Sequence, residues 1–254
     1  MSAIYNKLLN KHVLILGGTS GIGFGVAKAS LASSARVTVS SSSVDRVSSA
    51  VTKLTGEFPG AQVQGYACDL GGENVEEEIE SLFEKVGSVD HIVFTVGEKP
   101  LAMPLADITR EKILAPAQIR LVAPILVAKV GSKYLSAGPE SSITLTTGQA
   151  WERPAPDWTI MSGYLGAYYS LTRNLALDMK PVRVNAVSPA IVETEMWDGM
   201  PKEQKEGIFQ FMASKYPTGR VTKPETLAEA YLYLMKDSNI TGRVVGSDSG
   251  ASLV

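Results

Sequence analysis

The chain has 254 residues, of which 44% are hydrophobic and 20% are charged, and its formal net charge is −2. Such a composition is typical of a globular protein with a sizeable core, and one α/β domain can reach this length. The small net charge gives no electrostatic basis for binding nucleic acid or an anionic membrane, so we expect neither as a partner.

The single cysteine, Cys68, excludes an internal disulfide and suits a reducing compartment. No run of about twenty uninterrupted apolar residues predicts a membrane span, and residues 1–10 lack the apolar segment of a signal peptide. The expected location is therefore cytoplasmic.

A glycine-rich loop follows the first predicted strand, residues 13–16, and precedes a predicted helix over Gly21–Ala32. Its glycines let the backbone turn tightly and let a phosphate approach the main chain. The N–H groups and the positive dipole end of the helix would face that phosphate. The loop predicts a dinucleotide site formed by Gly17, Thr19, Ser20, Gly21, Ile22 and Gly23.

The second predicted strand, residues 35–40, leads into Ser40, Ser41, Ser42, Ser43 and Arg46. A carboxylate at this place would bind the ribose 2′-hydroxyl and repel a 2′-phosphate, but none occurs before Asp45. Hydroxyls and a guanidinium suit a phosphate better, so NADP(H) is the expected cofactor. The alternative is that the serines only cap the following helix.

The third predicted strand, residues 62–66, is followed by Cys68, Asp69 and Leu70. Asp69 is placed to accept a hydrogen bond from the adenine amine, and we assign these three residues to the nucleotide site. Asp69 could equally cap a helix.

Strand-like and helix-like segments alternate through the rest of the chain. The remaining strands are predicted at 91–95, 143–146, 182–187 and 243–246, and further helices at 44–54, 73–86 and 159–179. Helices between strands imply right-handed crossovers and a parallel sheet covered on both faces. We therefore predict one α/β domain over residues 1–254, a doubly wound parallel sheet of about seven strands with its ligand at their carboxyl ends.

Residues 189–217 have few strand signals, a helical patch near 202–214, and apolar residues such as Trp197 and Phe209. After the sixth strand, this segment would lie over the ligand edge of the sheet. It can act as a mobile lid over the substrate, or it can be an ordinary helical insertion packed on the core.

The sequence resembles the short-chain dehydrogenase/reductase family over essentially its whole length. The resemblance rests on the glycine loop, on Cys68-Asp69-Leu70, and on the runs at 184–190, 192–194, 240–242 and 248–250. It implies a Rossmann-type sheet, with the nicotinamide end bound after the sixth strand by Pro189, Ile191, Val192 and Thr194. Thr95, Val96 and Gly97 stand where the family has the end of its Asn-Asn-Ala-Gly motif.

The catalytic residues of the family are missing. Its serine position falls on Gly148, and its Tyr-x-x-x-Lys falls on Met161 and Leu165. No lysine occurs between residues 134 and 179, so a shift in register does not restore the motif. The helix-four asparagine of the family falls near Arg120, which could hold a cofactor phosphate, a ribose hydroxyl or a substrate carbonyl, or could be an exposed or ion-paired residue.

Without the serine and the Tyr-x-x-x-Lys, the site can reduce fewer kinds of substrate. Reduction of a ketone builds negative charge on oxygen and needs an acid, whereas reduction of an iminium carbon neutralises a cation. A carboxylate such as Asp157 could stabilise that cation, and Trp158 and Trp151 could stack on it. Asp157 could instead cap the helix that begins near Thr159, and both tryptophans could be packing residues.

The motif at 153–158, with Arg120 and the missing Tyr-x-x-x-Lys, resembles an atypical fungal branch of the family, the malbrancheamide- and paraherquamide-type reductases. That resemblance implies NADPH-dependent reduction of an iminium in an indole-alkaloid intermediate, coupled to an intramolecular Diels–Alder reaction. The candidate catalytic residues are Asp157, Arg120 and Trp158, and the substrate is expected to be small and apolar or cationic.

Two alternatives stay open: a carbonyl reductase that uses Asp157 or Tyr164 as the acid, and an NADP(H)-binding sensor without redox activity. The family resemblance also implies a homodimer or homotetramer formed through the long helix at 159–179. His12 and His91 lie at strand starts, away from the ligand edge, and are expected to be structural; no metal site is predicted.

Overall fold

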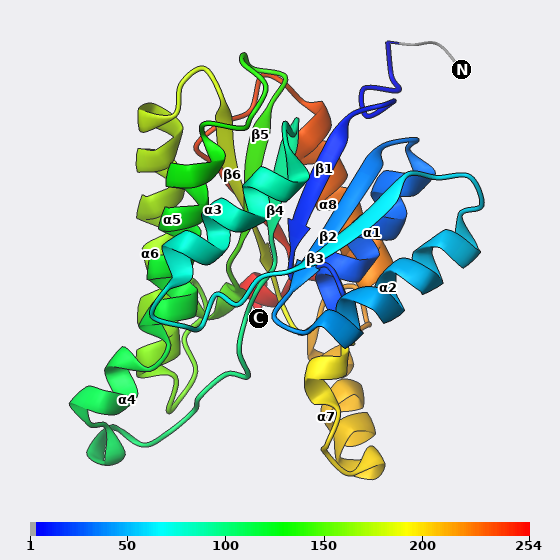
Figure 1. The fold of residues 1–254 in the computed structure, drawn as a ribbon. Helices are drawn as coiled ribbons and strands as arrows, with labels where there is room; N and C mark the ends of the chain where they lie inside the picture. Colours follow the sequence, from blue (N-terminus) through cyan, green and yellow to red (C-terminus); the bar gives the residue numbers. More distant parts are fainter. Residues whose placement is uncertain (1–3) are drawn as a thin grey trace.

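The computed structural model describes residues 4–254 (Figure 1). Seven parallel strands form one sheet in the order β3-β2-β1-β4-β5-β6-β7. They are β1 (His12–Leu16), β2 (Arg36–Ser41), β3 (Val63–Ala67), β4 (His91–Phe94), β5 (Ser142–Thr146), β6 (Arg183–Pro189) and β7 (Val244–Ser247). The predicted doubly wound parallel sheet is confirmed, and each predicted strand lies within two residues of an observed one.

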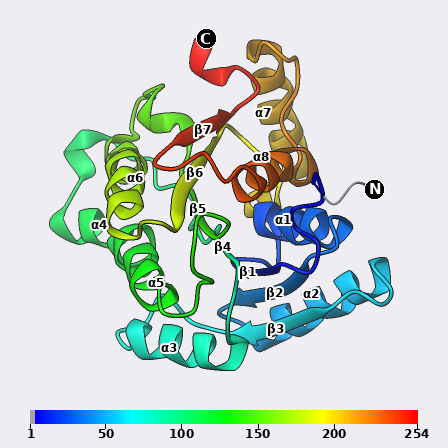
Figure 2. The ribbon, with the colours of Figure 1, turned by 90° about the horizontal axis from the view of Figure 1, so that it is seen from above.

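Helices cover both faces of the sheet (Figure 2). One face carries α1 (Gly21–Ala32), α2 (Val44–Glu57) and α8 (Pro224–Lys236), and the other carries α3 (Val75–Val86), α5 (Ala123–Gly131) and α6 (Thr159–Asp178). The remaining elements are η1 (Leu105–Asp107), α4 (Arg110–Leu114), the π-helical turn η2 (Gln118–Val122), η3 (Gln149–Trp151), η4 (Glu195–Trp197), α7 (Lys202–Lys215) and η5 (Ala251–Leu253). In Figure 1 the strands run downward, and α4 and α7 lie beyond their carboxyl ends.

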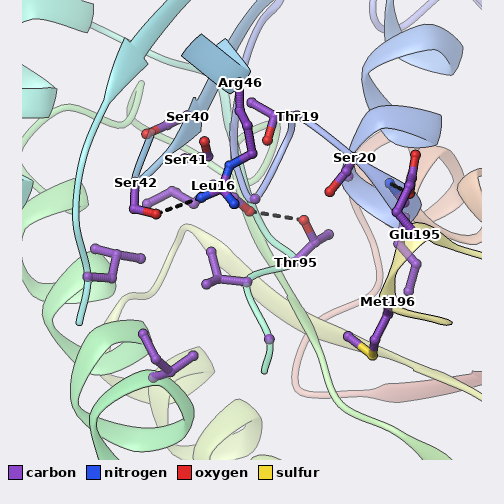
Figure 3. A pocket seen from close by; sticks show the side chains of 18 of the residues that line it. Leu16, Thr19, Ser20, Ser40, Ser41, Ser42, Arg46, Thr95, Glu195 and Met196 are labelled. Atoms are coloured by element: carbon purple, nitrogen blue, oxygen red, sulfur yellow. Dashed lines mark hydrogen bonds between the residues drawn. The ribbon is translucent and has the colours of Figure 1, made fainter. Parts of the chain in front are cut away.

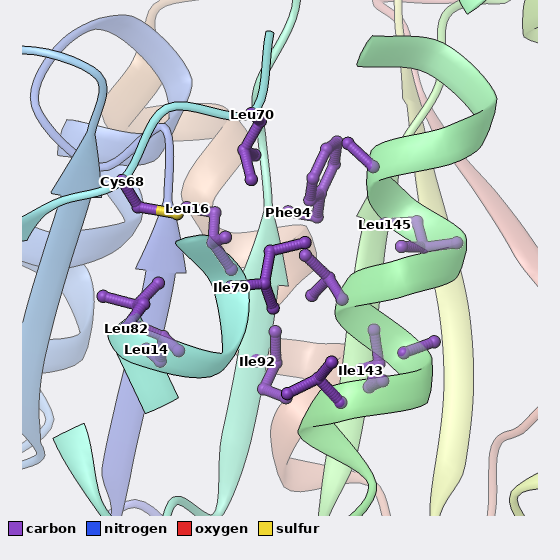
Figure 4. Packing of buried hydrophobic residues seen from close by; sticks show 14 of the residues in the cluster. Leu14, Leu16, Cys68, Leu70, Ile79, Leu82, Ile92, Phe94, Ile143 and Leu145 are labelled. Atoms are coloured by element: carbon purple, nitrogen blue, oxygen red, sulfur yellow. The ribbon is translucent and has the colours of Figure 1, made fainter. Parts of the chain in front are cut away.

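The sheet separates two hydrophobic layers. Leu14, Ile92 and Ile143 belong to the layer under α3, α5 and α6, which Figure 4 shows. Val13 and Ile15 point the opposite way, into the layer under α1 and α8. Successive residues of a strand face opposite sides of a sheet, so the continuous apolar run of β1 is buried on both faces. Packing on both faces holds β1 in place, and the glycine loop begins at the end of this strand.

Both histidines lie at the amino ends of strands, opposite the carboxyl edge. The ring nitrogens of His12 lie 2.9 Å from the Ser88 carbonyl oxygen and 2.8 Å from the Thr38 hydroxyl. His91 Nδ1 lies 2.9 Å from the Ser142 hydroxyl. Burial lowers the pKa of both imidazoles, that of His91 to about 3, so both are neutral parts of the sheet.

By length and composition, one helical stretch among the described residues, Arg110–Gly131, could cross a membrane; 44% of its apolar window is buried in the fold. Core helices meet the same criterion, so this is weak support for membrane insertion. The stretch is also divided into α4, η2 and α5.

A buried arginine ties the start of β6 to the end of α8. Arg183 is 2% exposed, and its guanidinium donates to the carbonyl oxygens of Leu234 (2.6 Å), Met235 (2.9 Å) and Pro139 (2.5 Å). Two of these carbonyls belong to the last turn of α8, where a cation also meets the negative end of the helix dipole.

Replacing this arginine with an apolar residue of similar length leaves several buried carbonyl oxygens without a donor. We expect Arg183→Met to lower the free energy of unfolding by about 3 to 5 kcal/mol, measured by urea denaturation. Arg243→Met, at an exposed position next to β7, is the matched control and should change it by less than about 0.5 kcal/mol. Equal stability of the two variants would contradict this role.

Candidate active site

The site lies where the chain order of the sheet reverses. β1 and β4 are neighbours, but the chain continues from them toward opposite edges of the sheet, which opens a crevice at their carboxyl ends. The backbone N–H and the hydroxyl of Thr95 both donate to the Leu16 carbonyl oxygen, at 2.9 and 3.0 Å (Figure 3). The last residue of β1 and the first residue after β4 are thereby joined.

The glycine loop is packed tightly against this junction. A Cβ atom on Gly23 would lie 2.2 Å from the Gly17 carbonyl oxygen and 2.5 Å from the Thr95 hydroxyl oxygen. Gly17 also has a φ of +82°, which favours glycine. No side chain fits at Gly23 without opening the loop. The loop is therefore built from glycines whose backbone is not covered by side chains of its own.

The first turn of α1 presents its amides to this bare loop. Phe24 N–H donates to the Ser20 carbonyl at 3.1 Å, and the N–H groups of the three preceding residues have no partner within the helix. The Ser20 side chain makes no capping hydrogen bond, and the first turn holds no acidic residue. These amides lie at the positive end of a helix dipole and fit a phosphate, and that of Gly21 donates to the Glu195 carboxylate, an anion of the chain itself.

A cleft of about 300 Å³ extends from this loop along the ends of β2, β3 and β4. Most of the residues predicted for the nucleotide site line it: Gly17, Thr19, Ser20, Gly21, Ile22, Gly23, Ser40, Ser41, Ser42, Arg46, Cys68, Asp69, Leu70, Thr95, Val96, Gly97 and Thr194. Sequence reasoning missed Leu16, Ile119, Glu195 and Met196. Glu195 and Met196 directly follow Thr194, so their position in the chain was the available signal.

Several predicted residues do not line the cleft. Ser43 caps α2, where its hydroxyl accepts from Arg46 N–H at 3.3 Å, as the alternative interpretation expected. Val192 is 6% exposed and packs in the core on the α8 side. The others outside the lining are Pro189, Ile191, Arg120, Asp157 and Trp158.

The far end of the cleft carries hydroxyls and a cation. Arg46 Nη2 donates to the Ser42 hydroxyl at 2.8 Å, and Figure 3 shows both side chains on the same wall. Asp69 accepts from Gly71 N–H at 3.0 Å in a tight turn and does not cap α3, whose N-cap is Asn74. Arg46 and Ser42 therefore form a small cationic and hydroxyl-bearing site.

Cys68 brings no reactive thiol to the cleft. Its side chain is 3% exposed, and burial raises the pKa of the thiol to about 12. The thiol is therefore protonated at neutral pH and acts as an apolar group.

Apolar side chains occupy the positions where the family has its tyrosine proton donor and its lysine. Met161 is 2% and Leu165 6% exposed, and Leu165 Cδ1 lies 3.4 Å from where a Cβ of Gly148 would stand. The Tyr164 hydroxyl donates to the Ile113 carbonyl oxygen at 2.6 Å, and burial raises the pKa of Tyr168. Neither tyrosine is poised to give up a proton here.

Arg120 lies on η2, next to Gly97 of the cleft lining. It is 8% exposed, and its Nη2 donates to the Glu98 carbonyl at 2.9 Å and lies 3.8 Å from where a Cβ of Gly97 would stand. Its buried Nε has no hydrogen-bond partner among residues 4–254. Burial lowers the pKa of the guanidinium, mainly through lost hydration. The fold thus holds a cation with unused donor capacity behind the cleft wall.

Asp157 lies in an exposed loop and has a left-handed backbone, with φ of 68°. Its carbonyl oxygen accepts from Met103 N–H at 2.8 Å, which joins the loop before α6 to the loop after β4. The N-cap of α6 is Trp158, so the alternative interpretation of Asp157 as the cap is wrong. A non-glycine residue in this conformation is strained by about 1 kcal/mol and is often found at functional sites.

A second cavity of about 390 Å³ adjoins the cleft through Met196. Its floor includes Lys99, whose ammonium donates to the Asp198 carbonyl at 3.3 Å. The lining combines thioether, proline and indole groups with polar ones, namely Met196, Met200, Pro100, Pro201, Trp197, Asp198 and Gln204. This cavity suits a mainly apolar or aromatic ligand that also carries a polar or charged group.

Residues 4–254 match the family described as the SDR-like Rossmann domain. A short-chain dehydrogenase/reductase of Gibberella fujikuroi, fsr5, is 39% identical over 257 residues, 98% of this chain and 97% of that protein. The structure of MalC reductase/Diels-Alderase from Malbranchea aurantiaca superposes with a TM-score of 0.93 and 39% identity, covering 99% of this chain and 100% of that one.

A small-chain dehydrogenase solved in complex with NADPH is 27% identical, with a TM-score of 0.78, and the match covers 96% of this chain and 100% of that one. The glycine loop, the crevice at β1 and β4 and the seven-stranded order agree with these matches. The chain therefore belongs to the short-chain dehydrogenase/reductase family.

Proposed function

We propose that this protein is an NADP(H)-dependent reductase that delivers hydride to the carbon of an imine or iminium in an alkaloid-type intermediate. The observation that carries the proposal is a phosphate-binding cleft joined to an apolar cavity, with apolar residues where the family has its proton donor. The likeness to MalC reductase/Diels-Alderase supports a reductase activity.

The residues of the cleft fit NADP(H). The loop at Gly23 and the N–H groups of the first turn of α1 would hold the pyrophosphate, and Arg46 with Ser42 would hold the 2′-phosphate. Thr194 lines the cleft on the side where the nicotinamide is expected. When bound, the cofactor supplies the hydride.

An acid-free site suits an iminium. Hydride transfer to a ketone leaves an alkoxide, which needs a donor, whereas transfer to a cationic carbon–nitrogen double bond leaves a neutral amine. Leu165 and Met161 offer no proton, and the Tyr164 hydroxyl is engaged with a backbone carbonyl. This argues against the alternative of a carbonyl reductase that uses Tyr164 as its acid.

Asp157 is the carboxylate that we assign to the substrate cation. Its loop is joined through Met103 to the loop that carries Lys99, and Lys99 lines the apolar cavity. A carboxylate near a cationic substrate stabilises the charged form. Trp158, next to it in the chain, is the candidate for stacking on the substrate.

The lid assignment of residues 189–217 also belongs to this proposal. No residue of α7 is buried, so the helix is attached mainly through neighbours such as Trp197, whose ring lies 5.5 Å from that of Phe209. A weakly packed helix over a substrate cavity can open at low free-energy cost.

An accompanying intramolecular cycloaddition is a second candidate activity. It rests on the likeness to MalC reductase/Diels-Alderase and on the apolar cavity, which could hold a reduced diene in a folded conformation. For assembly, a homodimer or homotetramer stays a prediction; Tyr169 and Leu177 of α6 are 41% and 68% exposed and are available for such contacts.

Deuteride transfer tests the reductase proposal. With NADPH deuterated at C4 and a panel of cyclic iminium salts and ketones, we expect deuterium at the former iminium carbon, detected by mass spectrometry, and none in the alcohols. Tight NADPH binding without oxidation by any substrate would favour the sensor alternative.

Arg46 should decide the cofactor preference. We expect Arg46→Ala to weaken NADPH binding about 10- to 100-fold, because a charge-assisted contact to the 2′-phosphate is lost, and to leave NADH binding unchanged. Lys53→Ala, the same loss of charge further along α2, is the control. Fluorescence titration measures both, and equal loss for NADH and NADPH would contradict the assignment.

Asp157→Asn should raise KM for an iminium substrate about tenfold, because the neutral amide no longer attracts the cation. Because hydride transfer removes the positive charge, kcat should not fall. Asparagine tolerates a positive φ, so the loop should keep its shape and NADPH affinity should not change. Glu152→Gln, an exposed carboxylate of the same loop, is the matched control. An unchanged KM for the iminium in Asp157→Asn, measured by steady-state kinetics, would remove this residue from substrate binding.

A further inference from the structure

A carboxylate of the lid segment lies on the phosphate-binding loop. Glu195 Oε2 accepts from the Gly21 N–H at 2.7 Å, and Figure 3 shows this side chain beside Ser20. Thr194 also packs against Gly21, since its Cγ2 lies 3.1 Å from where a Cβ of Gly21 would stand. The chain after β6 is thus folded onto the first turn of α1.

The Gly21 amide is one of the donors that a pyrophosphate would use. It belongs to the first turn of α1, where N–H groups have no helical partner and the dipole favours an anion. A carboxylate and a phosphate are both anions, and two like charges at hydrogen-bonding distance from one donor repel each other. They cannot occupy this place together.

We infer that Glu195 is an internal anion that latches the lid segment onto the first turn of α1 and must be displaced when the cofactor binds. The inference rests on the proposed NADP(H) function. It assigns to Glu195 a positioning role, because the side chain acts on the cofactor site and on the segment that carries it.

Displacement of Glu195 reaches the substrate cavity. Glu195 begins η4, in which Met196 lines both the cleft and the second cavity. In the same turn, the Trp197 indole N–H donates to the Val192 carbonyl at 3.0 Å. Movement of this turn reshapes the cavity wall formed by Met196 and Trp197. The latch therefore makes the binding order cofactor first, substrate second.

The hydrogen bond between Glu195 and Gly21 is exposed, so water weakens it. Breaking it should therefore lower the affinity for the cofactor only modestly. We expect Glu195→Gln to bind NADP⁺ roughly 3- to 10-fold more tightly than the native chain, the size of one exposed charge-assisted hydrogen bond. Glu195→Ala should bind at least as tightly.

Calorimetry with two ligands tests this. NADP⁺ carries the pyrophosphate, whereas 2′-AMP should reach only Arg46 and Ser42, so its affinity should not change in Glu195→Gln. Glu193→Gln, an exposed carboxylate two positions earlier with no contact to Gly21, controls for a general change of charge. Unchanged NADP⁺ affinity in Glu195→Gln, or an equal gain for both ligands, would overturn the latch.

A second readout does not need the cofactor. In the cofactor-free protein, the Gly21 amide should exchange its hydrogen several-fold faster in Glu195→Gln than in the native chain, measured by NMR, and no difference would overturn the latch. If the native chain and all variants fail to bind NADP⁺, the proposed function fails, and the exchange measurement still tests the contact itself.

Discussion

The contact between the glycine loop and the end of β4 determines where every other part of the site lies. Gly23 is so close to the Gly17 carbonyl and to Thr95 that no side chain fits between them. Because β1 is buried on both faces, the strand below the loop cannot shift to relieve a larger residue. The start of α1, with the amides of its first turn, is thereby held at the crevice.

The cleft that begins at this contact carries groups suited to phosphates at two places. The amides of the first turn of α1 lie at one place and the Arg46–Ser42 pair at another, both suited to phosphates. Arg120 is turned toward the Glu98 carbonyl, next to Gly97 of the cleft lining. The groups suited to phosphates thus line the cleft, whereas the buried guanidinium lies behind its wall.

Much of this could be predicted from the sequence, because the deciding patterns are local. The strands are continuous apolar runs, and the phosphate loop is a strand, a glycine cluster and a helix in succession. What could not be predicted depends on contacts between distant residues. Glu195 and Gly21 are 174 positions apart in the chain, and they meet because the segment after β6 returns to the start of α1. The hydrogen bond between Asp157 and Met103 likewise joins two separate loops, which no local pattern reveals.

The central claim is that hydride reaches the substrate without a proton donor from the protein. The pH dependence of kcat for an N-methylated cyclic iminium salt, whose charge does not titrate, tests it most directly. The account predicts a kcat that is constant within about twofold between roughly pH 6 and 9, because no acid acts in the transition state. A kcat that falls about tenfold per pH unit above a single pKa would show that a protein acid is required and would contradict the account.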